Sequence, residues 1–140
     1  MLTDEEIMKM CFEEADRSPD ERLKVGCIIT DKKGYLCVKS HNGVIQNYYI
    51  KSINWDDTNQ KNDCMIHAEM KAIINNPEHH ANGLTLYCTD EPCWNCAKLI
   101  VAAGIEKVVY VRPYQSIGHT SGSKILLDAG ITIRKLPWQL

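Results

Sequence analysis

The sequence predicts an α/β domain, and three of its patterns lead to this prediction. Apolar residues recur at helical spacing near the amino terminus, two β-rich runs separated by a turn follow, and the second half alternates between helical and strand patterns. A length of 140 residues fits one domain spanning 1–140. With 44% hydrophobic and 24% charged residues, the composition is that of a globular protein and not of a disordered chain.

The first half contains a helix and a hairpin. Thr3 begins a Thr-x-x-Glu capping box, which predicts a helix over residues 4–16. The β-rich runs 24–30 and 35–39 flank a Gly-containing turn and therefore predict a β-hairpin. From residue 41 to about residue 63 no periodicity remains, and a connection of this length usually has a function.

The second half alternates helices with single strands, a pattern typical of crossover connections. We expect helices over 65–75, 93–103 and from Ser121 or Ser123 to 129, and strands over 84–88, 107–111 and 131–136. Gly104 and Gly130 follow two of these helices and are suited to end them.

Charge and cysteine usage narrow the class of function. The net charge of −2 does not indicate a basic groove for nucleic acid, and no apolar window is long enough to cross a membrane. The amino terminus is acidic and lacks the pattern of a secretory signal. Seven cysteines, an odd number, argue against a disulfide framework, so we expect reduced thiols and a cytoplasmic location.

Two short motifs carry the chemistry. One is His67-Ala68-Glu69, and the other is a Pro-Cys-x-x-Cys run that holds Cys93 and Cys96. Together they match the H-x-E…P-C-x-x-C signature of zinc-dependent deaminases. Each motif opens a predicted helix, so the positive ends of two helix dipoles would favour thiolates there. Three protein ligands, His67, Cys93 and Cys96, would leave the fourth position of a Zn²⁺ ion open for water, as in catalytic zinc sites.

Glu69 lies on the apolar face of its predicted helix, where a carboxylate is costly unless it is used. Its position two residues after the histidine would let it reach the metal-activated water. We therefore expect Glu69 to be the general acid–base residue, taking a proton from the water and giving one to the leaving amine.

A structural zinc site is the alternative to catalysis. Cys64-Met65-Ile66-His67 combined with the two later cysteines would give four ligands and a closed site. Such a non-catalytic zinc module would leave Glu69 and the long polar connection unexplained.

The chain resembles the deoxycytidylate (dCMP) deaminase branch of the zinc-dependent cytidine and deoxycytidylate deaminases. The similar segments cover nearly the whole chain, as expected for a single deaminase domain. They are 67–73, 92–98, 103–110 and 129–136, with the pairs at 17–18, 25–26 and 42–43.

This resemblance implies a three-layer fold with a mixed five-stranded sheet and helices on both faces. It also implies a hydrolase that uses zinc to convert dCMP into dUMP and ammonia, supplying dUMP for thymidylate synthesis. Water would attack C4 of the cytosine while Glu69 moves protons. The Ala68 N–H would bind the C2 carbonyl, Asn42 would contact the sugar, and Tyr114 would flank the substrate. The expected assembly is a homo-oligomer, a hexamer.

The resemblance leaves the phosphate site and the nucleotide open. Ser18 is the first candidate for the phosphate, and Arg112, Arg17 and Lys24 are further cationic candidates. Many members carry Gly-Tyr-Asn-Gly-x-Pro for a regulatory triphosphate, but residues 40–45 read Ser-His-Asn-Gly-Val-Ile. Regulation by dCTP and dTTP is thus in doubt. Other cytosine nucleotides (dCTP, CMP), a nucleoside or a tRNA adenosine are alternative substrates.

Overall fold

A mixed five-stranded sheet forms the centre of the protein, shown here by a computed structural model that describes residues 1–45, 52–79, 81–114 and 120–137. The strand order is β2-β1-β5-β6-β7. These strands are β1 (Gly26–Thr30), β2 (Leu36–His41), β5 (Thr85–Asp90), β6 (Lys107–Arg112) and β7 (Thr132–Lys135). β1 runs antiparallel to β2 and β5, whereas β5, β6 and β7 are parallel. The predicted α/β class, mixed sheet and hairpin are confirmed.

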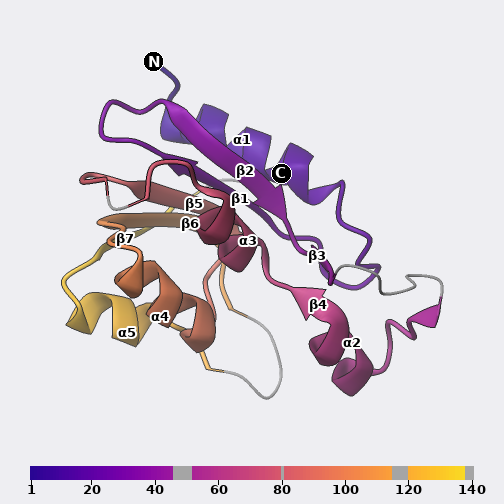
Figure 1. Ribbon diagram of the computed structural model, residues 1–140. Coiled ribbons are helices and arrows are strands. Elements are labelled where there is room, and N and C mark those ends of the chain that lie inside the picture. Colours follow the sequence, from indigo (N-terminus) through magenta and orange to yellow (C-terminus); the bar gives the residue numbers. More distant parts are fainter. Residues whose placement is uncertain (46–51, 80, 115–119, 138–140) are drawn as a thin grey trace.

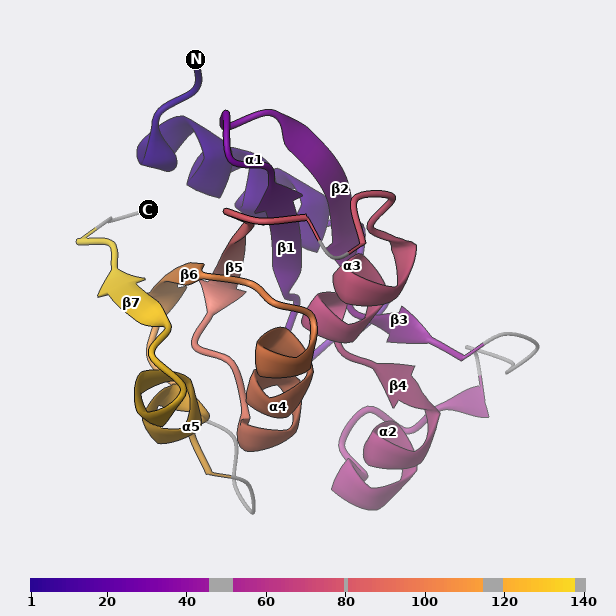
Figure 2. The same ribbon diagram turned by 60° about the vertical axis from the view of Figure 1, so that its left-hand side comes forward.

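Helices cover both faces of the sheet, as Figure 1 and Figure 2 show. α1 (Asp4–Ala15) lies on one face, and α3 (Ala68–Asn75), α4 (Trp94–Ala102) and α5 (Ser123–Asp128) lie on the other. Side chains along the central strands alternate between the two layers. On β1, Ile28 packs with α1, while Cys27 and Ile29 pack with α3 and α4.

The first helix begins as the sequence predicts. The Thr3 hydroxyl oxygen accepts from the Glu6 N–H at 3.1 Å, and the Glu6 carboxylate accepts from the Thr3 N–H at 3.1 Å. Gly26 lets this helix approach the sheet closely, because a Cβ built at that position would lie 1.9 Å from the Cys11 carbonyl oxygen. At the end of α4, Gly104 has φ +76°, which confirms the expected glycine terminator.

The stretch from residue 41 to about residue 63, expected to be a long connection without periodicity, contains secondary structure. This stretch contains β3 (Gly43–Val44) and the short helix α2 (Thr58–Cys64), which starts at Asp57 as its N-cap. The following residues form β4 (Met65–Ile66), whose two residues pair antiparallel with β3. For that reason the helix expected from residue 65 begins only at Ala68. In the described part of the chain, no helix is both long and apolar enough to cross a membrane.

Candidate active site

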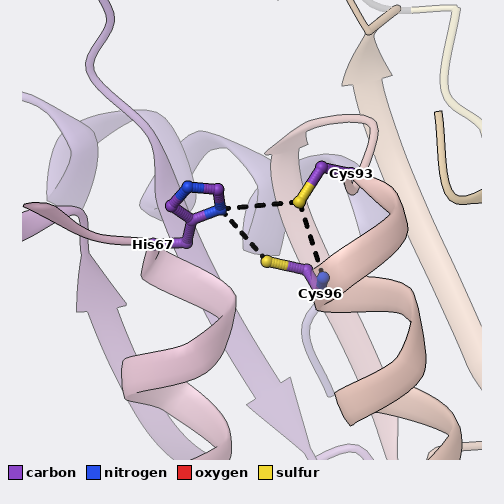
Figure 3. A group of neighbouring side chains, drawn as sticks. All are labelled: His67, Cys93 and Cys96. Carbon is purple, nitrogen blue, oxygen red and sulfur yellow. Dashed lines mark hydrogen bonds between the residues drawn. The ribbon is translucent and has the colours of Figure 1, made fainter. Parts of the chain in front are cut away.

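The amino-terminal ends of α3 and α4 bring the two sequence motifs together. His67 is the N-cap residue of α3, Cys93 is the N-cap residue of α4, and Cys96 follows in the first turn of α4. The Nδ1 atom of His67 lies 3.2 Å from the sulfur of Cys96 and 3.6 Å from that of Cys93 (Figure 3). The Cys96 N–H also points at the Cys93 sulfur, at 3.5 Å.

These three side chains could hold one metal ion. Their ligand atoms all lie within 4.8 Å of one another, and they are the one such group among the described residues. Both cysteines are buried, whereas His67 is exposed, so the group is open on the histidine side. Two sulfurs and one imidazole nitrogen suit Zn²⁺, and three ligands leave a tetrahedral position open.

Cys64 does not join this group, and the four-ligand alternative therefore has no support in the structure. Its thiol lies 3.7 Å from the Lys61 carbonyl oxygen at the end of α2. Among the described residues, the group of possible metal ligands contains His67, Cys93 and Cys96 but not Cys64.

Hydrogen bonds among the three side chains shift their pKa values. The pKa of the Cys93 thiol is lowered to about 4, chiefly by its hydrogen bond with Cys96 and also by that with His67. The same hydrogen bond raises the pKa of the Cys96 thiol, and the pairing with Cys93 raises the pKa of His67. Zinc binds thiolates and neutral imidazole, so zinc binding would displace the protons that Cys96 and His67 hold.

Glu69 occupies the first turn of α3, two residues after His67, and its side chain is only 5% exposed. Burial raises the pKa of its carboxyl, and the neighbouring His67 partly offsets that rise. A raised pKa suits a group that must both accept and donate a proton near neutral pH. The buried carboxyl is close enough to His67 for each group to shift the pKa of the other.

Asn42 is buried, and its amide is bonded to backbone. Its Oδ1 accepts from the Val25 N–H at 2.9 Å, and its Nδ2 donates to the Leu23 carbonyl at 2.9 Å. Asn42 therefore fixes the segment that precedes β1. The contact with the sugar that the resemblance implies stays a prediction.

Three of the phosphate candidates, Ser18, Lys24 and Arg112, lie close together in the structure. The Lys24 ammonium donates to the Ser18 carbonyl at 2.6 Å, and Arg112 donates to the Lys24 carbonyl at 2.8 Å. Arg112 is also held by Asp90 at 2.7 Å. Arg17 instead points to Glu14 on α1, at 3.7 Å.

The other two expected substrate residues lie at the ends of secondary structure elements. Ala68 is fully buried as the first residue of α3, and its carbonyl accepts from the Ser40 hydroxyl at 2.6 Å. Tyr114 follows β6, is half-buried, and donates its N–H to Glu91 at 3.1 Å. The roles of Ala68 and Tyr114 toward a substrate stay predictions.

A buried ion pair that the sequence does not predict joins α2 to the Ser18–Lys24 segment. Asp20 is fully buried and accepts from the Lys61 ammonium of α2 at 2.7 Å. The same carboxylate accepts from the N–H groups of Arg22 at 2.8 Å and Leu23 at 3.1 Å. No sequence spacing signals this pair, because its partners are far apart in the chain and each is a common surface residue type.

Loss of that ion pair should be costly for stability. Lys61→Met is expected to lower the free energy of unfolding by about 3 kcal/mol, because it leaves the Asp20 charge buried without its cationic partner. Lys124→Met is the matched control, since the Lys124–Asp128 pair is exposed on α5 and should contribute less than about 0.5 kcal/mol. Denaturant unfolding of both variants measures the difference. Equal small losses would show that the buried pair does not hold α2 in place.

Comparison with known families identifies the group to which this arrangement belongs. Residues 1–112 match the family model described as the cytidine and deoxycytidylate deaminase zinc-binding region. The chain belongs to the cytidine and deoxycytidylate deaminase family. The matched region includes His67, Glu69, Cys93 and Cys96, and its description as zinc-binding confirms zinc as the expected cofactor.

Individual proteins that are similar to this deaminase support the family match. The human deoxycytidylate deaminase is 30% identical over 138 residues, which cover 94% of this chain and 78% of the relative. Among solved structures, the apo dCMP deaminase of cyanophage S-TIM5 has a TM-score of 0.76 and 26% identity, covering 95% of this chain and 96% of that one. The same phage enzyme in complex with dCMP and dUMP has a TM-score of 0.72 and 27% identity, with 94% and 95% covered. The deaminase-like fold implied by the resemblance is confirmed.

Proposed function

We propose that this deaminase hydrolyses dCMP to dUMP and ammonia. The single observation that carries the proposal is the convergence of His67, Cys93 and Cys96 at two helix amino termini, with the buried Glu69 two residues from the histidine. The similarity to a phage enzyme described in complex with dCMP and dUMP supports the choice of nucleotide.

In this proposal His67, Cys93 and Cys96 hold the zinc ion. When bound, zinc supplies a Lewis acid that makes water a nucleophile at neutral pH. Glu69 accepts a proton from the attacking water and passes protons to N3 of the cytosine and to the departing amino group. The C4–O bond forms, the C4–N bond breaks, and dCMP and water become dUMP and ammonia.

The remaining residues bind and orient the nucleotide. Ala68 would donate its N–H to the C2 carbonyl oxygen, because the first N–H groups of a helix have no partner inside it. Asn42 and Tyr114 would flank the sugar and base. Ser18 and Arg112 would meet the phosphate. Hydrogen bonds place Lys24 next to both of them, so three of the candidates lie together.

We also infer the domain organisation, location and assembly of the protein. Residues 1–140 form one deaminase domain, the protein is cytoplasmic, and six copies assemble into a homo-hexamer. Seven unpaired cysteines fit a reducing compartment. Light scattering tests the assembly: a particle near six times 15.9 kDa is expected, and a 15.9 kDa particle would contradict the hexamer.

A second cytosine nucleotide, dCTP, remains the alternative because the stretch around Asn42 departs from the family pattern. His41 stands where the family has tyrosine. Its Nδ1 lies 2.8 Å from the Glu14 carboxylate, so an imidazole–carboxylate pair replaces the phenol ring.

A substrate panel tests the proposal. Ammonia release is measured with cytidine, CMP, dCMP, dCTP and single-stranded DNA, at equal concentration. We expect kcat/KM for dCMP to exceed that for cytidine by at least about 100-fold, since the phosphate adds charge-assisted hydrogen bonds that cytidine cannot make. A preference for dCTP would transfer the assignment to that nucleotide, and release only from DNA would contradict the proposal.

A further inference from the structure

Glu91 lies between the last residue of β5 and the turn that carries Cys93. Its backbone N–H donates to the Arg112 carbonyl at 2.8 Å, which extends the pairing of β5 with β6 by one residue. The residue is half-buried. The proposed reaction assigns no role to this residue.

The Glu91 carboxylate joins two segments that are distant from it in the sequence. One oxygen, Oε1, accepts from the backbone N–H of Tyr114 at 3.1 Å. The other, Oε2, accepts from the hydroxyls of Ser121 and Ser123. Three donors on one carboxylate satisfy both of its oxygens, and charge-assisted bonds of this kind are about twice as strong as neutral ones.

The serine segment is in turn bonded to the turn that bears the proposed zinc ligand. Ser121 and Cys93 form an isolated antiparallel bridge, and the Trp94 N–H donates to the Thr120 carbonyl at 3.0 Å. The Gly122 N–H donates to the Pro92 carbonyl at 2.8 Å. A Cβ at Gly122 would lie 2.6 Å from the Cys93 carbonyl oxygen, so the two segments are in close backbone contact.

We propose that Glu91 is a positioning residue of the deaminase site, which fixes the Cys93 turn and Tyr114 in one arrangement. The inference rests on the proposed function. Removal of the carboxylate takes away the side-chain bonds to the Ser121–Ser123 segment, which is bonded through its backbone to the turn that orients the Cys93 sulfur. The same change removes the bond to the N–H of Tyr114, the residue expected to flank the substrate. Outer residues that orient metal ligands typically change metal affinity or activity by about 10–100-fold.

The test compares three variants of the zinc-loaded protein. Glu91→Ala removes all three bonds. Glu91→Gln keeps them possible, because its amide can accept from the Tyr114 N–H and donate to both serine hydroxyls. Asp31→Ala is the matched control. Asp31 accepts from the N–H groups of Lys33 at 2.9 Å and Tyr35 at 3.0 Å in the β1–β2 turn, at the opposite end of the sheet from Glu91.

The main readout is the rate of zinc release to a chromophoric chelator, measured without substrate and together with the melting temperature. Glu91→Ala should release zinc at least about 10-fold faster and lose about 10–100-fold in kcat/KM for dCMP. Glu91→Gln should stay within about threefold of wild type in both, and Asp31→Ala should release zinc at the wild-type rate whatever its melting temperature. Release from Glu91→Ala within twofold of wild type would overturn the proposal, as would equal acceleration by Asp31→Ala.

Ser121→Ala keeps the test decisive if Glu91→Ala does not fold. This variant removes one of the three donors to Glu91, at the residue that pairs with Cys93 through its backbone. Zinc release should again be several-fold faster. An unchanged rate would overturn the proposal. The release assay needs no substrate. It therefore gives its answer for Glu91 even if the substrate panel contradicts dCMP deamination.

Discussion

Replacement of Glu69 by glutamine is expected to leave zinc bound at one ion per chain while kcat falls by about 10²–10⁴-fold. The amide has nearly the same shape as the carboxylate, but it can neither accept the proton of the attacking water nor deliver it to the amino group. Because Glu69 is buried and its carboxyl pKa is raised, the substitution removes a costly buried charge, and we expect stability to be retained or increased. Metal analysis, ammonia release and thermal unfolding measure the three effects.

The matched control is Glu106→Gln, which changes an exposed carboxylate in the connection before β6. It should retain wild-type zinc, kcat and KM. Wild-type turnover in Glu69→Gln would remove Glu69 from the reaction. A loss of zinc in Glu69→Gln would mean that the carboxylate supports the metal group instead of moving protons.

Replacement of Cys96 by alanine should abolish stoichiometric zinc binding and lower activity by more than about 100-fold. The thiol is one of the three proposed ligands, and only His67 and Cys93 would remain to hold the ion. Zinc content after gel filtration and ammonia release from dCMP are the measurements.

Two further cysteine variants provide the controls. Cys37→Ala removes a half-buried thiol in β2, and Cys64→Ala removes the thiol at the end of α2. Both variants should keep one zinc per chain, although Cys64→Ala should lose some stability because its thiol is fully buried. Zinc loss in Cys64→Ala would instead restore the structural zinc module with Cys64 as fourth ligand.

The features that could be predicted are those with a local pattern. A capping box marks the start of α1, β-rich runs mark β1 and β2, and the spacing of three between Cys93 and Cys96 puts both sulfurs at one helix start. His67 and Glu69 are two residues apart, so a single helix start decides the position of both. Each of these features depends on residues that are neighbours in the chain. The residues of the metal group could therefore be predicted before their distances were known.

The features that were missed depend on distant partners. The short helix α2 reads Thr-Asn-Gln-Lys-Asn-Asp-Cys and buries only Cys64, so it has no apolar periodicity. Its Lys61 pairs with Asp20, a residue far earlier in the chain. Likewise Glu91 resembles any charged residue before a Pro-Cys motif, and only the fold shows that Tyr114 and two serines converge on it.

Zinc K-edge X-ray absorption on the purified, zinc-loaded protein tests the central claim most directly. That claim is one ion held by His67, Cys93 and Cys96 with a fourth position open to water. The expected first shell contains two sulfurs at about 2.3 Å and nitrogen or oxygen neighbours at about 2.0–2.1 Å. A third sulfur, or a protein that binds no zinc at all, would contradict it.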